Sequence, residues 1–193
     1  MDQTRCAWVG KDEIYQKYHD NVWGRAVVDS QELFAKLCLD GQQAGLSWIT
    51  ILKKQENYED AFHNFDPVKI SQMTEDDVER LMQNKGIVRN RLKINSIIKN
   101  ARAYLAIEQS GMSFSDFIWQ FVEHKTVHNE WKSKQDVPVS TPQSSEMAKA
   151  LKKHGFSFVG TTICYAFMEA VGLINDHTTD CFCYQSAYRA GRK

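Results

Sequence analysis

The spacing of apolar residues along the chain predicts helices almost throughout. After Ser113, apolar side chains recur at positions i, i+3, i+4, i+7 and i+8, which places them on one helix face: Phe114, Phe117, Ile118, Phe121 and Val122. A longer amphipathic pattern covers residues 90–109, with apolar positions at Leu92, Ile94, Ile97, Ile98, Ala101 and Leu105. Both patterns follow the helical period and lack the alternation that is typical of strands.

Polar caps and prolines mark where further helices begin. Asp29 and Glu32 form a capping-box pattern, which can satisfy free N–H groups at the start of a helix. Asp66 precedes Pro67, and proline fits the first helical position. Thr74 precedes an acidic first turn, where negative side chains interact favourably with the helix dipole. Two more helices are expected in the C-terminal part, at residues 141–155 and 160–170.

Strand signals are scarce. Val27 with Val28 and residues 156–159 are the only candidates, and both runs are too short to form a sheet. Residues 124–141 are polar and without clear periodicity, so we expect an exposed loop that joins two halves of a helical body. The pattern therefore predicts an all-α fold in which residues 1–193 form a single domain.

The composition is that of an ordinary globular protein, with 193 residues, 42% hydrophobic and 25% charged. No apolar run approaches the roughly 20 residues that a membrane span needs. Residues 1–13 lack the apolar stretch of a secretory signal. We therefore expect a cytoplasmic protein that does not associate with a membrane.

The net charge is zero, with 24 basic and 24 acidic residues, which argues against a protein held to nucleic acid by charge alone. One local basic cluster surrounds a short turn at Gly86 and consists of Lys85, Arg89, Arg91 and Lys93. A helix–hairpin–helix at this turn would present N–H groups and basic side chains to DNA phosphates. A solvated basic start of a helix explains the same residues equally well.

Cysteine and histidine residues gather at the two ends of the chain. Cys6 and His19 lie near the N-terminus, and His177 and Cys181 lie four residues apart near the C-terminus. Two thiolates and two imidazoles can form a closed tetrahedral zinc site, but the spacing alone equally fits unrelated residues. Cys183 is a rival ligand from the same segment. The remaining two cysteines lie among apolar residues and are expected to be buried thiols: Cys38 and Cys164.

Two segments combine aromatic and polar side chains. Residues 6–24 contain Trp8, Tyr15, Tyr18 and Trp23. Residues 39–54 contain Asp40, Gln42, Gln43 and Trp48, beside the glycines Gly41 and Gly45. A pocket for a planar base needs aromatic faces for stacking and a few polar groups for the edge of the base. Each aromatic residue alone is explained as well by packing in the core.

Six blocks of the sequence together resemble bacterial 3-methyladenine DNA glycosylase I, a family similar to the helix–hairpin–helix glycosylases. The blocks are CAWV, YHDNVWG, LDGQQAGLSWITILKK, KGIVRNR, GFSFVGTTICYAFMEA and GLINDH with the cysteine that follows it. They run in the order of the family from about Cys6 to Cys183. The resemblance implies a monomer that binds double-stranded DNA carrying alkylated bases.

The resemblance also implies a structural zinc ion that joins residues 6–23 to residues 177–183. By position its ligands are Cys6, His19, His177 and Cys181, so that Cys183 is not a ligand. Metal binding there would stabilise the fold and hold the aromatic N-terminal segment against the base pocket. Zinc that activates water is disfavoured, because four protein ligands leave no open coordination position.

For the base pocket, the resemblance implies stacking on Trp8 and Trp48, with Trp23 and Tyr15 in the wall. Tyr18 and the acid before the GQQAGLSW block would bind the edge of the base and carry catalysis. That acid is Asp40 here, whereas the family pattern has glutamate, which is one methylene longer. The resemblance implies in addition that Gly45 and Leu46 enter the duplex as a wedge.

The implied reaction is hydrolysis that releases free 3-methyladenine and leaves an abasic site. After KGIVRNR no acid occurs before Glu108, so catalysis is expected from the pocket itself. Cleavage of the strand through a Schiff base is not indicated, because Lys93 is the only lysine near the expected hairpin end. A module that senses damaged bases without excising them is the alternative, and release of free base distinguishes the two.

Overall fold

Helices account for most of residues 3–189, which are the residues that the computed structural model of the protein describes. The α-helices are α1 (Glu13–Asn21), α2 (Ser30–Gln42), α3 (Trp48–Leu52), α4 (Gln55–Ala61), α5 (Pro67–Ser71), α6 (Glu75–Met82), α7 (Arg91–Gln109), α8 (Phe114–Trp119), α9 (Pro142–Lys153), α10 (Thr161–Ala170) and α11 (Tyr184–Arg189). Short 3-10 turns occupy His63–Phe65, Gln120–Val122 and Lys134–Asp136. The helical content expected from the apolar spacing is thereby confirmed.

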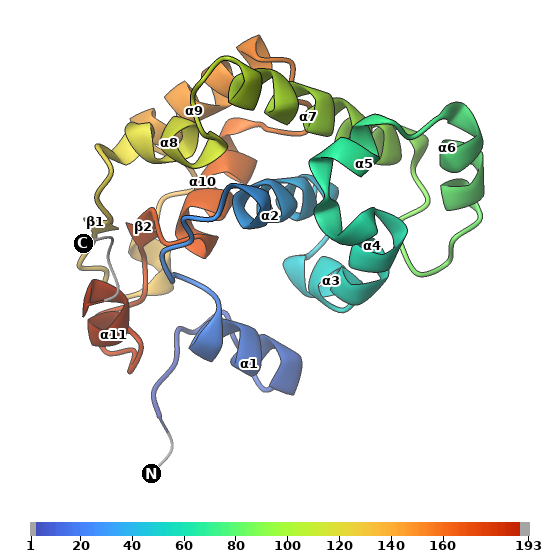
Figure 1. Ribbon diagram of the computed structural model, residues 1–193. Coiled ribbons are helices and arrows are strands. Elements are labelled where there is room, and N and C mark those ends of the chain that lie inside the picture. Colours follow the sequence, from blue (N-terminus) through green and yellow to red (C-terminus); the bar gives the residue numbers. More distant parts are fainter. Residues whose placement is uncertain (1–2, 190–193) are drawn as a thin grey trace.

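The helices surround α2, which lies in the middle of the molecule beside α10 (Figure 1). The long helix α7 extends across one side together with α8 and α9, and α3 to α6 form a group at one end. Helix α1 lies below α3, and α11 lies on the opposite side of the molecule from α4 to α6. A backbone hydrogen bond of 3.0 Å from Phe182 N to Thr4 O ties the two terminal segments together.

The apolar side chains form two clusters. The larger one is built around the buried face of α2, with Leu33, Phe34 and Leu37 fully buried. The smaller one contains Cys6, Val9, Tyr18, Trp23, Ala170, Cys181 and Cys183, and so unites the terminal segments. Trp48 packs against both clusters. The start of α3 therefore lies where the helical body meets the terminal segments.

The expected helix starts are confirmed by their caps. At the expected starts, the N-cap side chains that accept hydrogen bonds from the first turn include Asp29, Asp66, Asn90, Ser113 and Thr141. At α6, Thr74 and Asp77 form a capping box, with Thr74 N donating to Asp77 Oδ2 at 2.9 Å. The helix expected at residues 160–170 begins after Gly160, as α10.

A short parallel ladder was not expected from the sequence. Val127–His128 (β1) pairs with Ile174–Asn175 (β2), and the register aligns Val127 with Ile174. Because each strand has two residues and its partner is far along the chain, no local alternation in the sequence indicates this ladder. The prediction that residues 124–141 form an exposed loop is therefore wrong in part.

The same segment is fixed further by Trp131. Its Nε1 donates to Asp176 Oδ1 at 2.7 Å, and its carbonyl oxygen accepts from Thr179 N at 2.9 Å.

Leu92 also departs from expectation, since its side chain is 72% exposed although its spacing places it with the apolar face of α7. Within the described part of the chain, no helix is long and apolar enough to span a membrane.

Gly172 provides a test of the junction between α10 and the N-terminal segment. Its φ is +73°, and an added Cβ would lie 2.5 Å from Ala26 N. We expect Gly172→Ala to lower the free energy of unfolding by about 3 kcal/mol, through backbone strain and overpacking together. Urea denaturation measures this. Gly111→Ala is the control, because φ is +91° there but no atom lies within 4 Å. It should cost about 1 kcal/mol, and equal losses would contradict the close approach.

Candidate functional site

A cavity of about 460 Å³ opens between the N-terminal segment, α2, the start of α3 and α10. Its size suits a small planar ligand. The structure brings to this cavity the six residues that the resemblance assigns to the base pocket: Trp8, Tyr15, Tyr18, Trp23, Asp40 and Trp48. Of the two glutamines that the sequence also suggests, Gln43 lines the cavity, whereas Gln42 binds Tyr58 and Lys93. The six residues come from segments that are separate in the sequence, so packing alone does not require them to meet around one space.

The aromatic residues form an edge-to-face wall. The ring of Trp8 lies 5.0 Å from the ring of Tyr15 and 5.1 Å from that of Trp23, with interplanar angles of 67° and 70°. Tyr15 and Tyr18 are three residues apart on α1 and therefore lie on one face of it. Asp12 caps that helix and accepts hydrogen bonds from its first turn. The cap thus fixes the helix that carries both tyrosines.

Asp40 presents a buried carboxylate to the cavity. Its side chain is 2% exposed and one oxygen, Oδ1, pairs with the ammonium of Lys36, one turn earlier on α2. Burial raises the pKa of Asp40, and the charge of Lys36 opposes that rise. Among the described residues, Asp40 Oδ2 has no hydrogen-bond partner, and neither has Trp48 Nε1. One buried acceptor and one buried donor beside the cavity therefore lack a protein partner, whereas buried polar groups are normally paired.

Lys36 is a residue of the cavity that sequence reasoning missed. Its Nζ lies 3.7 Å from the centre of the Trp48 ring and 5.8 Å from that of Tyr18. Burial lowers the pKa of Lys36, whereas Asp40 and then Glu169 oppose the change. The i,i+4 spacing of Lys36 and Asp40 on a predicted helix was a signal that could have revealed the pair.

Glu169 on α10 is a second residue that the sequence did not single out. It lines the cavity, and burial, with a smaller effect from Asp176 and then Asp40, raises the pKa of this carboxyl well above its usual value. Burial also raises the pKa of Tyr18 well above 10, with a smaller contribution from Asp40. The Tyr18 phenol therefore keeps its proton at neutral pH and can donate a hydrogen bond.

The segment that the sequence left without a function covers part of the cavity. Lys134, Val137, Pro138 and Val139 line it, although they lie within residues 124–141. The hydrogen bonds of Trp131 and the β1–β2 pairing hold this segment against the C-terminal part of the chain. Only a tertiary contact reveals this role, because the residues are polar or isolated in the sequence.

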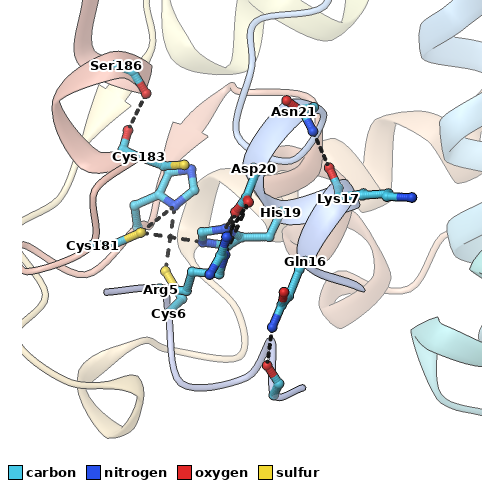
Figure 2. A network of polar contacts seen from close by, with 12 residues as sticks. Arg5, Cys6, Gln16, Lys17, His19, Asp20, Asn21, Cys181, Cys183 and Ser186 are labelled. Atoms are coloured by element: carbon cyan, nitrogen blue, oxygen red, sulfur yellow. Dashed lines mark hydrogen bonds and ion pairs between the residues drawn. The ribbon is translucent and has the colours of Figure 1, made fainter. Parts of the chain in front are cut away.

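A buried group of two cysteines and two histidines lies beside the cavity. Figure 2 labels three of its members, Cys6, His19 and Cys181. The potential ligand atoms of Cys6, His19, His177 and Cys181 all lie within 4.8 Å of one another. Cys181 Sγ is 3.4 Å from His19 Nε2 and 3.6 Å from His177 Nδ1, and Cys6 Sγ is 3.6 Å from His177 Nδ1. In a tetrahedral zinc site, sulfur and nitrogen ligands lie about 3.5 Å apart. The group could therefore hold a metal ion.

Polar partners orient this group. Asp20 Oδ1 lies 2.8 Å from His19 Nδ1, which leaves His19 Nε2 facing the sulfur of Cys181. Arg5 holds Asp20 in turn through Nε at 2.9 Å and Nη2 at 2.8 Å (Figure 2). A carboxylate behind a histidine is the usual arrangement around a metal ligand, because it fixes the tautomer and the ring orientation.

The cluster and the aromatic wall are in contact. The ring of His177 lies 4.6 Å from that of Trp23, and the ring of His19 lies 5.4 Å from that of Trp8. Cys6 itself lines the cavity. Any movement of the four cluster residues would therefore displace the wall.

The other three cysteines are buried and free. Cys183 belongs to a second, overlapping group with His19 and Asp20. Cys38 and Cys164 lie in the larger apolar cluster, as expected, and burial raises the pKa of both thiols, to about 12 for Cys164.

The basic turn lies between α6 and α7. Lys85 and Arg89 are exposed there, whereas Arg91 pairs with Glu75 and Glu79 at 2.5 and 2.6 Å. The turn is tightened by Gly86, whose N–H donates to Asn84 Oδ1 at 2.8 Å. At the end of α2, a second exposed loop contains Gly45, with a φ of +74°, and Leu46, which is 42% exposed.

The structure contradicts the assignment of Lys93 to a phosphate contact. Its side chain is buried, and Nζ donates to the carbonyl oxygens of Gln42 and Ala44 at 2.7 and 2.6 Å. The physical reason is that free carbonyl groups at the C-terminus of α2 attract a cation. Lys93 thus joins α7 to α2 and is not part of the exposed basic turn.

Known proteins resemble this chain in sequence and in fold. The methyladenine glycosylase family matches residues 8–184. A DNA-3-methyladenine glycosylase from Haemophilus influenzae is 56% identical over 183 residues, which cover 95% of this chain and 99% of that protein. A crystal structure of 3-methyladenine DNA glycosylase I is 59% identical, with a TM-score of 0.93 over 94% of this chain and all of the other.

A further solved structure is a variant of 3-methyladenine DNA glycosylase I in complex with 3-methyladenine. It is 42% identical, with a TM-score of 0.91, and the match covers 93% of this chain and 97% of that one. Nearly the whole chain is therefore shared with these proteins. It belongs to the methyladenine glycosylase family.

Lys93 can be tested as a structural residue. We expect Lys93→Met to lower the free energy of unfolding by about 2 kcal/mol, because two carbonyl groups lose a charged donor. Urea denaturation gives the value. Arg89→Met removes an exposed charge nearby and should change stability by less than about 0.5 kcal/mol. Unchanged stability in Lys93→Met, together with weaker DNA binding, would restore the phosphate assignment.

Proposed function

We propose that this protein binds alkylated double-stranded DNA, takes the damaged nucleotide out of the duplex and excises 3-methyladenine by hydrolysis, leaving an abasic site. The observation that carries the proposal is the cavity, where stacking rings face a buried carboxylate with an unpartnered oxygen. A family member bound to 3-methyladenine, 42% identical over most of the chain, supports the choice of base.

We assign a role to six of the side chains that line the cavity. Trp48 and Trp8 stack on the base, and Tyr15 and Trp23 complete the wall around it. Asp40 accepts a hydrogen bond from the edge of the base, and the protonated phenol of Tyr18 donates one. Aromatic stacking is available to any base, so selectivity rests on the polar pair at the edge.

The chemistry needs little acid catalysis. The N3-methylated nucleotide already carries a positive charge, so the bond between C1′ and N9 breaks with both electrons passing to the base. The base leaves neutral, the sugar becomes an oxocarbenium-like ion, and water adds to C1′ and loses a proton to solvent. Burial of Asp40 and Tyr18 keeps their contacts with the base in a site of low dielectric, where they count most.

DNA would be held by two exposed loops. Lys85, Gly86 and Arg89 in the turn between α6 and α7 would bind phosphates of one strand, as in a helix–hairpin–helix, with Arg91 at its edge. The loop with Gly45 and Leu46 would fill the space that the nucleotide leaves, because its apolar side chain is exposed. The ammonium of Lys93 is engaged by carbonyl groups, which supports a glycosylase without strand cleavage.

We also propose that Cys6, His19, His177 and Cys181 hold a structural Zn²⁺ ion. The interatomic distances fit a tetrahedral site, and four protein ligands leave no position for water. The ion would fix the terminal segments and, through His177 and Trp23, the aromatic wall.

The activity is tested by release of free 3-methyladenine from methylated duplex DNA. The wild-type chain should release it, and Asp40→Asn should slow release by about 100-fold, because the negative charge and one of the two acceptor oxygens are lost. Asp40→Glu should retain release, and Asp60→Asn, on the exposed face of α4, should match the wild type. Binding of methylated DNA without release by any variant would favour a damage sensor, and a borohydride-trapped adduct with abasic DNA would exclude the purely hydrolytic reaction.

The zinc site is tested by metal content and thermal unfolding. The purified protein should contain one zinc ion per chain, and its removal by a chelator should lower Tm by about 10 to 20 °C, because metal binding contributes to folding. Cys181→Ser should lose the ion, whereas Cys183→Ser should keep it. If both variants keep the ion, or if only Cys183→Ser loses it, the ligand set is wrong.

A further inference from the structure

The cavity already contains a cation. The ammonium of Lys36 lies 3.7 Å from the centre of the Trp48 ring, which is the position of a cation–π contact. The same ammonium pairs with Asp40, the carboxylate that faces the cavity. One lysine therefore engages both the stacking face and the acid that the proposed function assigns to the base.

Apart from the exposed Lys134, the charges that line the cavity around Lys36 leave it close to neutral. Asp40 and Lys36 form an ion pair, in which one charge cancels the other. Glu169 lines the same cavity. Burial, together with Asp176 and Asp40, raises the pKa of its carboxyl well above the usual value, so this carboxyl stays protonated. Tyr18 and Tyr165 are also protonated, since burial raises the pKa of both phenols. Without Lys36, a cationic ligand could take the place of the ammonium beside the carboxylate of Asp40.

We propose that Lys36 is a specificity-determining residue that makes the cavity favour the neutral, departing base over the cationic, still-attached base. Two cations compete for one carboxylate and one ring face, and in a buried site their repulsion is weakly screened. The neutral base suffers no such repulsion and can still hydrogen-bond to Asp40 Oδ2. This inference rests on the proposed function and concerns the same cavity.

The proposal has a consequence for the reaction. When the bond between C1′ and N9 breaks, both electrons pass to the base, its positive charge disappears and the charge develops on the sugar. An uncompensated carboxylate beside the base would resist that shift, because it stabilises the cationic base. The ammonium of Lys36 offsets this effect and destabilises the bound cation relative to the transition state. Lys36 therefore weakens substrate binding and speeds the bond-breaking step.

Two probes separate the charge of the ligand from its shape. 3-Methyladenine is neutral at mildly alkaline pH, whereas 3,9-dimethyladeninium is a permanent cation that imitates the attached base. We expect Lys36→Met to bind the cationic probe about tenfold more tightly and the neutral probe within about threefold of the wild type. Quenching of tryptophan fluorescence measures both affinities, since the tryptophans line the cavity.

Three variants serve as controls. Lys36→Arg keeps the charge and should keep the preference for the neutral probe, and Lys36→Gln replaces Lys36→Met if the latter does not fold. Lys17→Met removes one charge from the exposed face of α1 and should change neither affinity.

A second experiment measures single-turnover release of base from methylated DNA at saturating protein. Lys36→Met should release the base about tenfold more slowly, and its rate should reach half of its maximum at a lower protein concentration.

The outcomes distinguish the two proposals. An equal change in both affinities, or weaker binding of the cation by Lys36→Met, would overturn the role of Lys36 while the wild-type release of base still supports the glycosylase. If the wild type binds neither probe and releases no base, the proposed function fails and the role of Lys36 fails with it.

Discussion

The meeting of the two terminal segments in a buried group of thiols and imidazoles is the constraint on which the cavity depends. Cys6 and His177 are 171 residues apart in the chain, yet their ligand atoms are 3.6 Å apart. This closure costs conformational entropy that the short terminal helices cannot recover through their own packing. Because Trp8 and Trp23 pack directly on the histidines, the position of the aromatic wall depends on this closure.

The cavity combines this wall with a polar edge from the rigid body of the molecule. Asp40 and Lys36 lie on α2, which is packed against α7 and α10 in the larger apolar cluster. Lys93 reinforces the same helix, since its ammonium binds carbonyl groups at the end of α2. The aromatic wall and the charged edge are thus held by different parts of the fold, and Trp48 packs against both apolar clusters.

The sequence predicts those parts of the structure that depend on local signals. The helices around Asp29, Asp66 and Ser113 were found because a cap and an apolar period act within a few residues. The aromatic residues of the cavity and the Cys/His group were found through residue types, and their full assignment needed the resemblance. The pairing of Val127 with Ile174 could not be predicted, because the contact joins distant residues and leaves no periodicity.

Burial accounts for the misjudged side chains as well. Lys93 looks like a member of a basic turn, but its position on α7 directs the ammonium to free carbonyl groups, and a buried cation needs such partners. Leu92 is adjacent and apolar, yet it points away from the core and is 72% exposed. The helical period locates a face only to within about one position, so residues at its border can fall on either side.

The shorter acid and the lysine one turn before it are best understood together. The carboxylate of Asp40 is one methylene closer to the backbone of α2 than that of the glutamate which the resemblance implies, and it pairs with the side chain at i−4. Lys36 is the residue at i−4, and its aliphatic side chain places the ammonium over the ring of Trp48. The acid edge of the cavity thus carries a cation beside it, and under the role proposed for Lys36 this cation repels a charged base. A site of this kind gains selectivity through what it repels, which a hydrogen-bonding edge alone does not provide.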